Sequence, residues 1–322
     1  MRGDGVIGDR VITRRPRAEI GISIARRCLA VEQREQPDAF MANIISALTA
    51  HFSARFDRLM FDEASPPLAD IALDTADTVP TVTTDQATLA RSLTRAFAGL
   101  TPAQRLALIC RELTGRIVFT LGFGIEGQLL FHWIAELNLA IDVVTLDTGR
   151  LFPETYELWA KTEARYGRRI RAIYPDGPAL EKLIDRHGMN GFYDSVEARQ
   201  ACCDVRKVRP LDEALAGAQA WVSGVRADQT ETRRTAAFAQ ADSARQLVKV
   251  NPLLDWTRAR VWAEVAALDV PVNALHAKGF ASIGCAPCTR ALKPGEPERN
   301  GRWWWEAGGS RECGLHLPRK TA

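Results

Sequence analysis

The sequence predicts an α/β protein with a doubly wound, mostly parallel sheet and an irregular C-terminal tail. Three observations lead to this prediction. From about residue 86, short apolar runs alternate with segments of helical periodicity, which is typical of a parallel sheet covered by helices on both faces. A glycine-rich turn joins one of these runs to the next helical segment. After about residue 277, no helix or strand period continues.

The predicted elements follow one another in a regular order. Residues 86–113 have helical apolar spacing, and Thr101 followed by Pro102 marks a helix start within them. The predicted strands cover residues 116–121, 141–146, 169–174, 220–224 and 247–250. The predicted helices that follow cover residues 126–137, 153–165, 179–187 and 257–267. We find no internal repeat, so a solenoid or propeller is not expected.

The first 85 residues differ from this regular part. Residues 39–61 have the apolar pattern of one amphipathic helix, and a loop rich in Pro, Asp and Thr follows. The Arg-rich start would suit an organelle-targeting segment, but acidic residues among the arginines weaken that interpretation. We predict a partly disordered N-terminal extension at 1–85, an α/β nucleotide-binding domain at 86–277, and a functional tail at 278–322.

Composition argues against two broad classes of protein. The 322 residues carry 42 Lys+Arg against 39 Asp+Glu, and a net charge of +3 is too small for a dedicated nucleic-acid binder. No apolar run approaches the ~18–20 residues that span a bilayer. No secretory signal peptide is recognisable, so we expect a cytoplasmic protein with neither a nucleic-acid nor a membrane partner.

A glycine-rich turn follows the first predicted strand. Thr120 lies at the end of that strand, and Gly122, Gly124 and Glu126 lead into a helix. Such a turn presents backbone N–H groups and the positive end of a helix dipole, which can bind phosphate or sulfate. The turn is neither a Walker A motif nor a dinucleotide fingerprint, and a purely structural role stays an alternative.

Polar and basic residues after other elements suit an anionic ligand. Asp147 and Thr148 lie at the carboxyl end of the second strand, where ligands of open α/β sheets bind, and Arg150 can face an anion. Thr148 could instead serve as a helix N-cap. Further basic residues in loops would suit a nucleotide phosphosulfate, although a lone one is more often a solvated surface charge. These residues are Arg206, Lys207, Arg226 and Arg233.

The seven cysteines are the strongest signal. Cys202 and Cys203 are adjacent, and Cys285 and Cys288 form a CxxC pair. Two thiolate pairs can hold a zinc ion or an iron–sulfur cluster. Adjacent cysteines are strained around one tetrahedral zinc, so we favour a [4Fe–4S] cluster, with zinc and unliganded or disulfide-bonded thiols as alternatives.

One of the remaining cysteines has the surroundings of a nucleophile. Cys313 lies near the C-terminus between Arg311 and His316, and neighbouring cationic groups lower the pKa of a thiol. Cys28 and Cys110 have no such neighbours, and we interpret both as structural.

Five segments in a fixed order carry a family resemblance. They are Cys202-Cys203 with Arg206-Lys207, and residues 146–155 (LDTGRLFPET), 282–290 (SIGCAPCTR), 301–306 (GRWWWE) and 312–316 (ECGLH). This combination resembles the assimilatory adenylyl-sulfate reductases, within the broader family of phosphoadenylyl-sulfate and adenylyl-sulfate reductases. The resemblance covers about residues 86–318 and implies the adenine-nucleotide α-hydrolase-like fold of PP-loop type.

The resemblance also implies an activity and a cofactor. Cys313 would attack the sulfur of adenosine 5′-phosphosulfate, releasing AMP and leaving an S-sulfocysteine that thioredoxin reduces to sulfite, in sulfate assimilation for cysteine biosynthesis. The four paired cysteines, Cys202, Cys203, Cys285 and Cys288, would bind one [4Fe–4S] cluster per subunit. Since no thioredoxin-like domain is recognisable in the chain, the thioredoxin would be a separate protein. A homo-oligomer is also implied.

Individual site residues carry over by position. Lys207 would lie between cluster and substrate, and His316 would lie near the nucleophile. The residues expected to contact phosphate or sulfate, with a tryptophan beside them, are Arg206, Arg226, Arg233, Arg299, Arg302 and Trp303. Gly122 and Gly127 depart from the family, which commonly carries Ser and Asp there.

Two alternatives stay open. A 3′-phosphoadenylyl-sulfate reductase or a dual-specificity enzyme would need only a few added basic contacts. A non-catalytic Fe–S or zinc protein that senses nucleotides would have no need of Cys313.

Overall fold

The computed structural model describes residues 85–306 and 314–316. The helix predicted at 39–61, nearly all of the predicted N-terminal extension, and Cys28 and Cys313 lie outside the described residues.

A six-stranded sheet forms the centre of the described part, with strand order β3-β2-β1-β4-β6-β5. All neighbouring strands are parallel except β5 and β6, which are antiparallel. The strands are β1 (Ile117–Thr120), β2 (Asp142–Leu146), β3 (Arg171–Ile173), β4 (Ala220–Val222), β5 (Ala239–Asp242) and β6 (Leu247–Val250). The prediction of a doubly wound, mostly parallel sheet is confirmed. Strand order reverses between β1 and β4, and ligands of such sheets bind beyond the strand ends at this switch point.

Strand β5 was not predicted from the sequence. It forms a hairpin with β6 at the edge of the sheet, and Gln246 in the turn adopts a left-handed conformation, with φ of 54°. The strand is only four residues long and partly polar (AQAD), because an edge strand need not bury both faces. An apolar pattern is therefore missing at this position.

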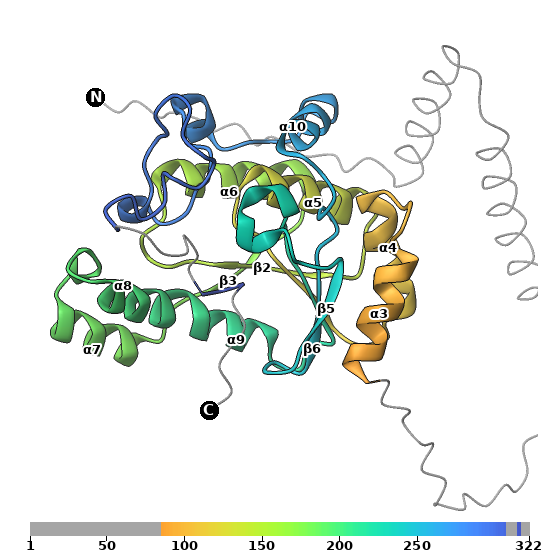
Figure 1. Cartoon of the computed structure of the whole chain (residues 1–322), viewed down its shortest axis with the longest axis horizontal. Helices are drawn as coiled ribbons and strands as arrows, with labels where there is room; N and C mark the ends of the chain where they lie inside the picture. Colours follow the sequence, from red (N-terminus) through yellow and green to blue (C-terminus); the bar gives the residue numbers. More distant parts are fainter. Residues whose placement is uncertain (1–84, 307–313, 317–322) are drawn as a thin grey trace, which may run out of the picture. The chain divides into compact units, whose positions relative to one another are not determined.

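Helices cover both faces of the sheet (Figure 1). Helices α5 and α6 lie on one face and α9 on the other, while the side chains of β1 alternate between the two: Ile117 and Phe119 join one core cluster and Val118 the other. The described α-helices are α3 (Gln86–Ala96), α4 (Pro102–Glu112), α5 (Ile125–Glu136), α6 (Pro153–Tyr166), α7 (Gly177–His187), α8 (Val196–Cys203), α9 (Arg209–Leu215) and α10 (Arg258–Ala267).

The helical pattern at 86–113 forms two helices, α3 and α4. The chain turns at Gly99, whose φ is +74°, and α4 begins as predicted at Thr101. The Thr101 hydroxyl accepts a hydrogen bond from the Gln104 backbone N–H, and the Gln104 side chain accepts one from the Thr101 N–H. This reciprocal capping fixes the start of the helix.

A π-helical turn at Asp204–Val208 joins α8 to α9. It directly follows the tandem cysteines at the end of α8 and carries Arg206 and Lys207, which are both buried. Turns of this kind recur at functional sites because they change the direction in which the following side chains point.

The described residues from 278 to 306 have little regular structure, as predicted, but hydrogen bonds among them hold the segment together. Thr289 and Arg302 form an isolated antiparallel bridge, and the Arg290 N–H donates to the Gly301 carbonyl at 2.9 Å. The Trp303 N–H donates to the carbonyl of Cys288 at 3.2 Å. Residues 285–303 therefore form a closed loop. No helix in the described ranges is long and apolar enough to cross a membrane.

Candidate active site

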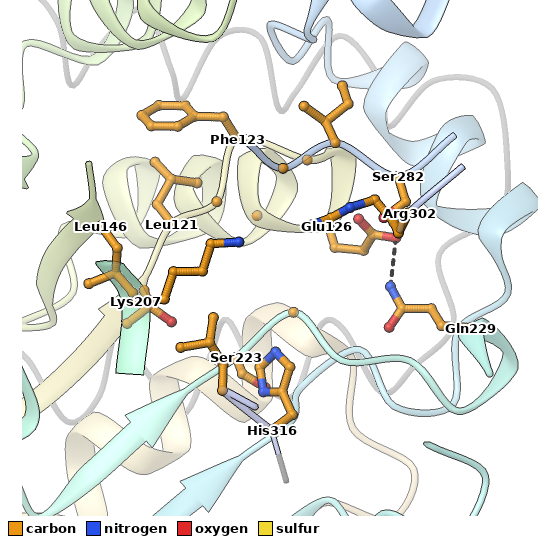
Figure 2. A pocket seen from close by; sticks show the side chains of 18 of the residues that line it. Leu121, Phe123, Glu126, Leu146, Lys207, Ser223, Gln229, Ser282, Arg302 and His316 are labelled. Carbon is orange, nitrogen blue, oxygen red and sulfur yellow. Dashed lines mark hydrogen bonds between the residues drawn. The ribbon is translucent and has the colours of Figure 1, made fainter. Parts of the chain in front are cut away.

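A cavity of about 250 Å³ opens at the switch point of the sheet. The turn after β1, from Thr120 to Gly127, forms one wall, and Ser223 and Gly224 after β4 form another. Residues 281–285, together with Leu315 and His316, also contribute to the lining. Figure 2 shows the Lys207 ammonium group pointing into this space.

The glycine-rich turn leads into α5 as predicted. Phe123 adopts a left-handed conformation, with φ of 56°, and buries its ring against Trp159. The N-cap of α5 is Gly124, which has no side chain to bond the first-turn N–H groups. Those donors and the helix dipole can therefore serve an anion in the cavity.

The two departures from the family pattern differ in their surroundings. A Cβ at Gly122 would have no described atom within 4 Å, whereas a Cβ at Gly127 would lie 3.0 Å from Cδ1 of Leu121. The cavity thus has room for a side chain at Gly122, but Gly127 allows close packing beneath the turn.

Four cationic side chains line the cavity: Lys207, Arg233, Arg299 and Arg302. The guanidinium group of Arg302 lies so close to Gly284 that it leaves no room for a Cβ there. Trp303 is buried and does not line the cavity; its ring contacts the guanidinium carbon of Arg302 at 4.6 Å. Trp303 therefore supports Arg302 on the side of its guanidinium group that faces away from the cavity.

The four paired cysteines come together beside this cavity. Cys203, Cys285 and Cys288 are buried in one cluster with Phe192 and Trp303, and Cys202 packs against it. None of the four forms a disulfide. Of the four, only Cys285 also lines the cavity.

The donor set consists of four cysteine thiols, a ligand type that both zinc sites and iron–sulfur clusters use. Among the described residues, no three His, Cys, Asp or Glu side chains lie close enough together to hold one ion. Tetrahedral zinc with Zn–S bonds of about 2.3 Å would require sulfur–sulfur separations of about 3.8 Å. A cubane binds each cysteine to a different iron, so its sulfur ligands lie farther apart.

Charged groups around the four cysteines favour the thiolate form of Cys285. Burial opposes ionisation of Cys285, but Lys207, the Thr148 hydroxyl and Arg302 together lower the pKa of its thiol. The Thr148 Oγ1 lies 3.2 Å from the Cys285 Sγ. Burial, with a smaller contribution from Cys285, raises the pKa of Cys288 to about 12. A buried thiol of this kind ionises readily only when a metal cation replaces its proton.

Four predicted substrate contacts lie outside the cavity lining and form hydrogen bonds with the protein instead. The Asp147 carboxylate accepts hydrogen bonds from the Gly149 N–H and the Tyr156 hydroxyl. Arg206 donates to the Thr148 carbonyl at 2.6 Å. Arg150 donates to the Met189 carbonyl, and its own carbonyl accepts from the Ala286 N–H. The residues so placed are Asp147, Thr148, Arg150 and Arg206.

Arg226 is also absent from the cavity lining. Its side chain is 0% exposed and forms ion pairs with Glu126, Asp228 and Glu298. A guanidinium group that is surrounded by three carboxylates is not available to a phosphate group. Arg226 instead fixes Glu126 and Glu298, which do line the cavity.

His316 stacks on Trp221, with ring centroids 5.4 Å apart and an interplanar angle of 9°. Its Nδ1 is buried and has no hydrogen-bond partner among the described residues. Burial, and then Lys249, Arg233, Arg299 and Arg245, hold the pKa of His316 well below its usual value. The imidazole is therefore neutral at pH 7.

Trp221 and Glu298 were not predicted as site residues. Trp221 lies within an apolar strand pattern, and such a residue is normally assigned to the core. Glu298 lies in an irregular segment where no periodicity indicates a direction. Neither position carried a signal that a single sequence could reveal.

Three comparisons with known proteins agree with this geometry. Residues 116–291 match the profile of the phosphoadenosine phosphosulfate reductase domain. The chain is 54% identical over 216 residues to an adenosine 5′-phosphosulfate reductase of Rhizobium meliloti, covering 67% of this chain and 81% of that protein. It is 50% identical over 211 residues to the protein of the same name from Allochromatium vinosum, covering 66% and 82%.

Among solved structures, the phosphoadenylyl-sulfate reductase from Candida auris, in a phosphate complex, has a TM-score of 0.54. It is 24% identical, and the match covers 62% of this chain and 96% of that one, so the two share a fold. The sheet topology, the matched residues and the two bacterial relatives lead to one conclusion: the chain belongs to the phosphoadenosine phosphosulfate reductase family.

Proposed function

We propose that this chain is an adenylyl-sulfate reductase, an oxidoreductase of sulfate assimilation that converts adenosine 5′-phosphosulfate to sulfite and AMP. The observation that carries the proposal is the meeting of Lys207 and Arg302 with Cys285 at the cavity. These cations suit a phosphosulfate, and the two bacterial relatives are named for this substrate.

The proposed chemistry proceeds in two covalent steps. The Cys313 thiolate attacks the sulfur of the substrate; the S–O bond to the phosphate breaks, and AMP leaves with that electron pair. One thiol of an external thioredoxin then attacks Cys313 Sγ, displacing sulfite and forming a mixed disulfide. The second thioredoxin thiol resolves this disulfide, so both electrons come from the dithiol.

Different residues of the cavity suit different parts of the substrate. The first-turn N–H groups of α5 suit the phosphate group, while Lys207, Arg299 and Arg302 suit the sulfate. Charge that develops on the bridging oxygen is stabilised by fixed donors in a partly dehydrated site. His316 lies three positions after Cys313 in the sequence, and its lowered pKa keeps the imidazole uncharged in the cavity.

We propose that Cys202, Cys203, Cys285 and Cys288 hold a [4Fe–4S] cluster. When bound, the cluster would supply a fixed charge beside Lys207 and the sulfate, with no net electron transfer. Iron and labile sulfide should each approach four per chain, as expected for one cluster per subunit. Zinc without iron would contradict this part of the proposal.

The decisive experiment follows sulfite release and the covalent intermediate together. Substrate added without reductant should increase the mass of the peptide containing Cys313 by one sulfonate group, and thioredoxin should remove it. Cys313→Ser should abolish both signals, and Cys110→Ser should preserve them because Cys110 lies away from the cavity lining. Sulfite release by Cys313→Ser would refute the mechanism.

We further propose that the catalytic unit comprises residues 86–277 and the tail at 278–322, with 1–85 outside it. We also propose a cytoplasmic location and a homo-oligomeric state. A chain that begins at residue 86 should retain its kcat/KM, and light scattering should give the number of subunits.

A further inference from the structure

Residues 314–316 directly follow Cys313 in the sequence and pack against the sheet. The His316 ring lies at the cavity wall (Figure 2) and stacks on Trp221 of β4, with ring centroids 5.4 Å apart. Leu315 packs against the buried apolar cluster between the sheet and α9, to which Trp221 also belongs. Two neighbouring side chains of the tail thus contact one indole and its surroundings.

Gly314 adds a third contact. Its φ of +85° lies in the left-handed region that favours glycine, and a Cβ there would be 3.6 Å from Cγ2 of Val208. Val208 ends the π-helical turn that carries Lys207. Residues 314–316 therefore lie against both β4 and the turn that directs Lys207 into the cavity.

The Trp221 side chain is a fixed platform. It is 1% exposed, and its Nε1–H donates to the Thr120 Oγ1 at 2.9 Å. Lys249, its partner in register on β6, places Nζ 4.9 Å from the ring centroid, and the guanidinium carbon of Arg245 lies 5.7 Å from it. An indole held by a hydrogen bond and two cations presents its surface in one orientation.

A role in the core alone does not account for the surroundings of Trp221. Together with Leu315 and His316 it lines the substrate cavity and also a second cavity of about 120 Å³, which residues 240–245 of β5 and the following turn complete. Because open space adjoins the tail residues at both cavities, their position depends on the contacts with Trp221, its apolar cluster and Val208.

We propose that Trp221 is a positioning residue for the reaction. With Val208 and the apolar cluster around it, Trp221 forms a seat for residues 314–316, and this tail seat determines where the Cys313 thiolate meets the substrate. The inference rests on the proposed function and adds to it the residue that aligns the nucleophile.

Covalent geometry connects the tail seat to the nucleophile. Cys313 is bonded to Gly314, and a trans peptide keeps neighbouring Cα atoms about 3.8 Å apart. A fixed Gly314 therefore limits the places that the thiol can reach. A displacement of about 1 Å between reacting groups can lower a rate about 10²-fold.

The kinetic test measures the first covalent step alone. Protein is mixed with adenosine 5′-phosphosulfate without reductant, and mass spectrometry of quenched samples gives the rate at which the sulfonate forms on Cys313. Trp221→Leu should lower this rate about 10²-fold and leave the Kd for AMP within about threefold. Trp221→Phe keeps a flat ring and should recover most of the lost rate. Trp256→Phe, at a buried tryptophan away from the cavity lining, should change neither quantity.

An NMR measurement separates this inference from the proposed function. An indole stacked on His316 shifts the imidazole ring protons upfield, and the signal is assigned by its loss in His316→Gln. The upfield shift should disappear in Trp221→Leu, a result that needs neither the Cys313 thiol nor thioredoxin. If wild type shows the shifted signal but forms no sulfonate, the proposed function fails, and the tail seat is still supported.

Two results for a folded Trp221→Leu protein would overturn the inference. One is a wild-type rate of sulfonate formation, and the other is a rate loss fully matched by weaker AMP binding, which would assign Trp221 to the nucleotide instead. If thermal unfolding shows that this variant is not folded, Leu315→Ala carries the test, because it alters the tail and leaves the sheet intact. It should lower the rate about tenfold or more, and a wild-type rate would be the contradicting result.

Discussion

The buried ion pair between Arg199 and Glu306 should contribute most to holding α8, which carries Cys202 and Cys203, against the loop that carries Cys285 and Cys288. Arg199 lies in α8 and Glu306 follows the closed loop, and the pair is bidentate, with distances of 2.7 and 3.0 Å. The side chains are only 4% and 10% exposed. Glu306→Ala would leave a buried guanidinium group without its carboxylate, a change that typically costs about 3–5 kcal/mol.

The lower end of that range applies here. Arg199 would keep its contact with the Trp303 ring, 4.9 Å from the guanidinium carbon, and cation–π contacts contribute about 0.5–2 kcal/mol. We therefore expect Glu306→Ala to lower the free energy of unfolding by about 3 kcal/mol. The double variant Arg199→Met with Glu306→Leu should lie within about 1 kcal/mol of wild type, because an apolar pair removes both buried charges.

Urea titration under anaerobic conditions, with iron content measured on the same samples, would check this expectation. Glu231→Ala serves as the control, because its pair with Arg234 is largely exposed and should be worth at most about 1 kcal/mol. The reasoning is refuted if Glu306→Ala costs no more than this control, or if the double variant is less stable than Glu306→Ala.

Three further predictions address the cavity. Lys207→Ala should lower kcat/KM about 10²–10³-fold, because it removes a hydrogen-bond donor to the charge that develops in the reaction. The control Lys182→Ala, at an exposed position, should leave kcat/KM unchanged. Equal kcat/KM values for the two variants would contradict a role of Lys207 in the reaction. Gly122→Ser should leave stability within about 0.5 kcal/mol. Gly127→Ala should cost up to about 2 kcal/mol in thermal unfolding, because overpacking against Leu121 costs about 1–3 kcal/mol and helix propensity returns about 1 kcal/mol. A larger cost for Gly122→Ser than for Gly127→Ala would be inconsistent with the open space at Gly122. Burial and neighbouring cations lower the pKa of His316 when its ring is stacked on Trp221, so an imidazole released from Trp221 binds a proton more readily. The stacking of His316 on Trp221 should therefore weaken as pH falls below about 6.5. An NMR titration that gives a pKa above about 6.5 for His316 would contradict this.

Much of the sheet was predictable because buried parallel strands produce continuous apolar runs. Strands β1, β2, β3, β4 and β6 all fall within their predicted ranges, and β3, at one edge of the sheet, covers only Arg171–Ile173 of the predicted 169–174. The antiparallel edge strand β5 left no such run. Local chain chemistry thus predicted the inner strands, and the edge depended on pairing across the hairpin.

The arginines show what a single sequence does not reveal. Arg206, Arg226 and Arg302 all follow or precede candidate binding segments, and nothing in their neighbours distinguishes them. In the structure Arg302 lines the cavity, Arg206 binds the Thr148 carbonyl, and Arg226 binds carboxylates. The direction of a long side chain depends on partners distant in sequence, such as Glu298, which is 72 positions from Arg226.

The π-helical turn explains how one short segment serves both the cysteine cluster and the cavity. In a regular α-helix, Cys203 and Lys207 would share one face, because positions four apart are neighbours. The π-helical turn at Asp204–Val208 keeps the two positions near each other: Cys203 joins the buried cluster, and Lys207 lines the cavity and lowers the pKa of Cys285. The Lys207 ammonium group can thus interact with a charge at the cysteine cluster and with a charge on the substrate. This shared cation would be the physical link between the proposed cluster site and the proposed reaction at Cys313.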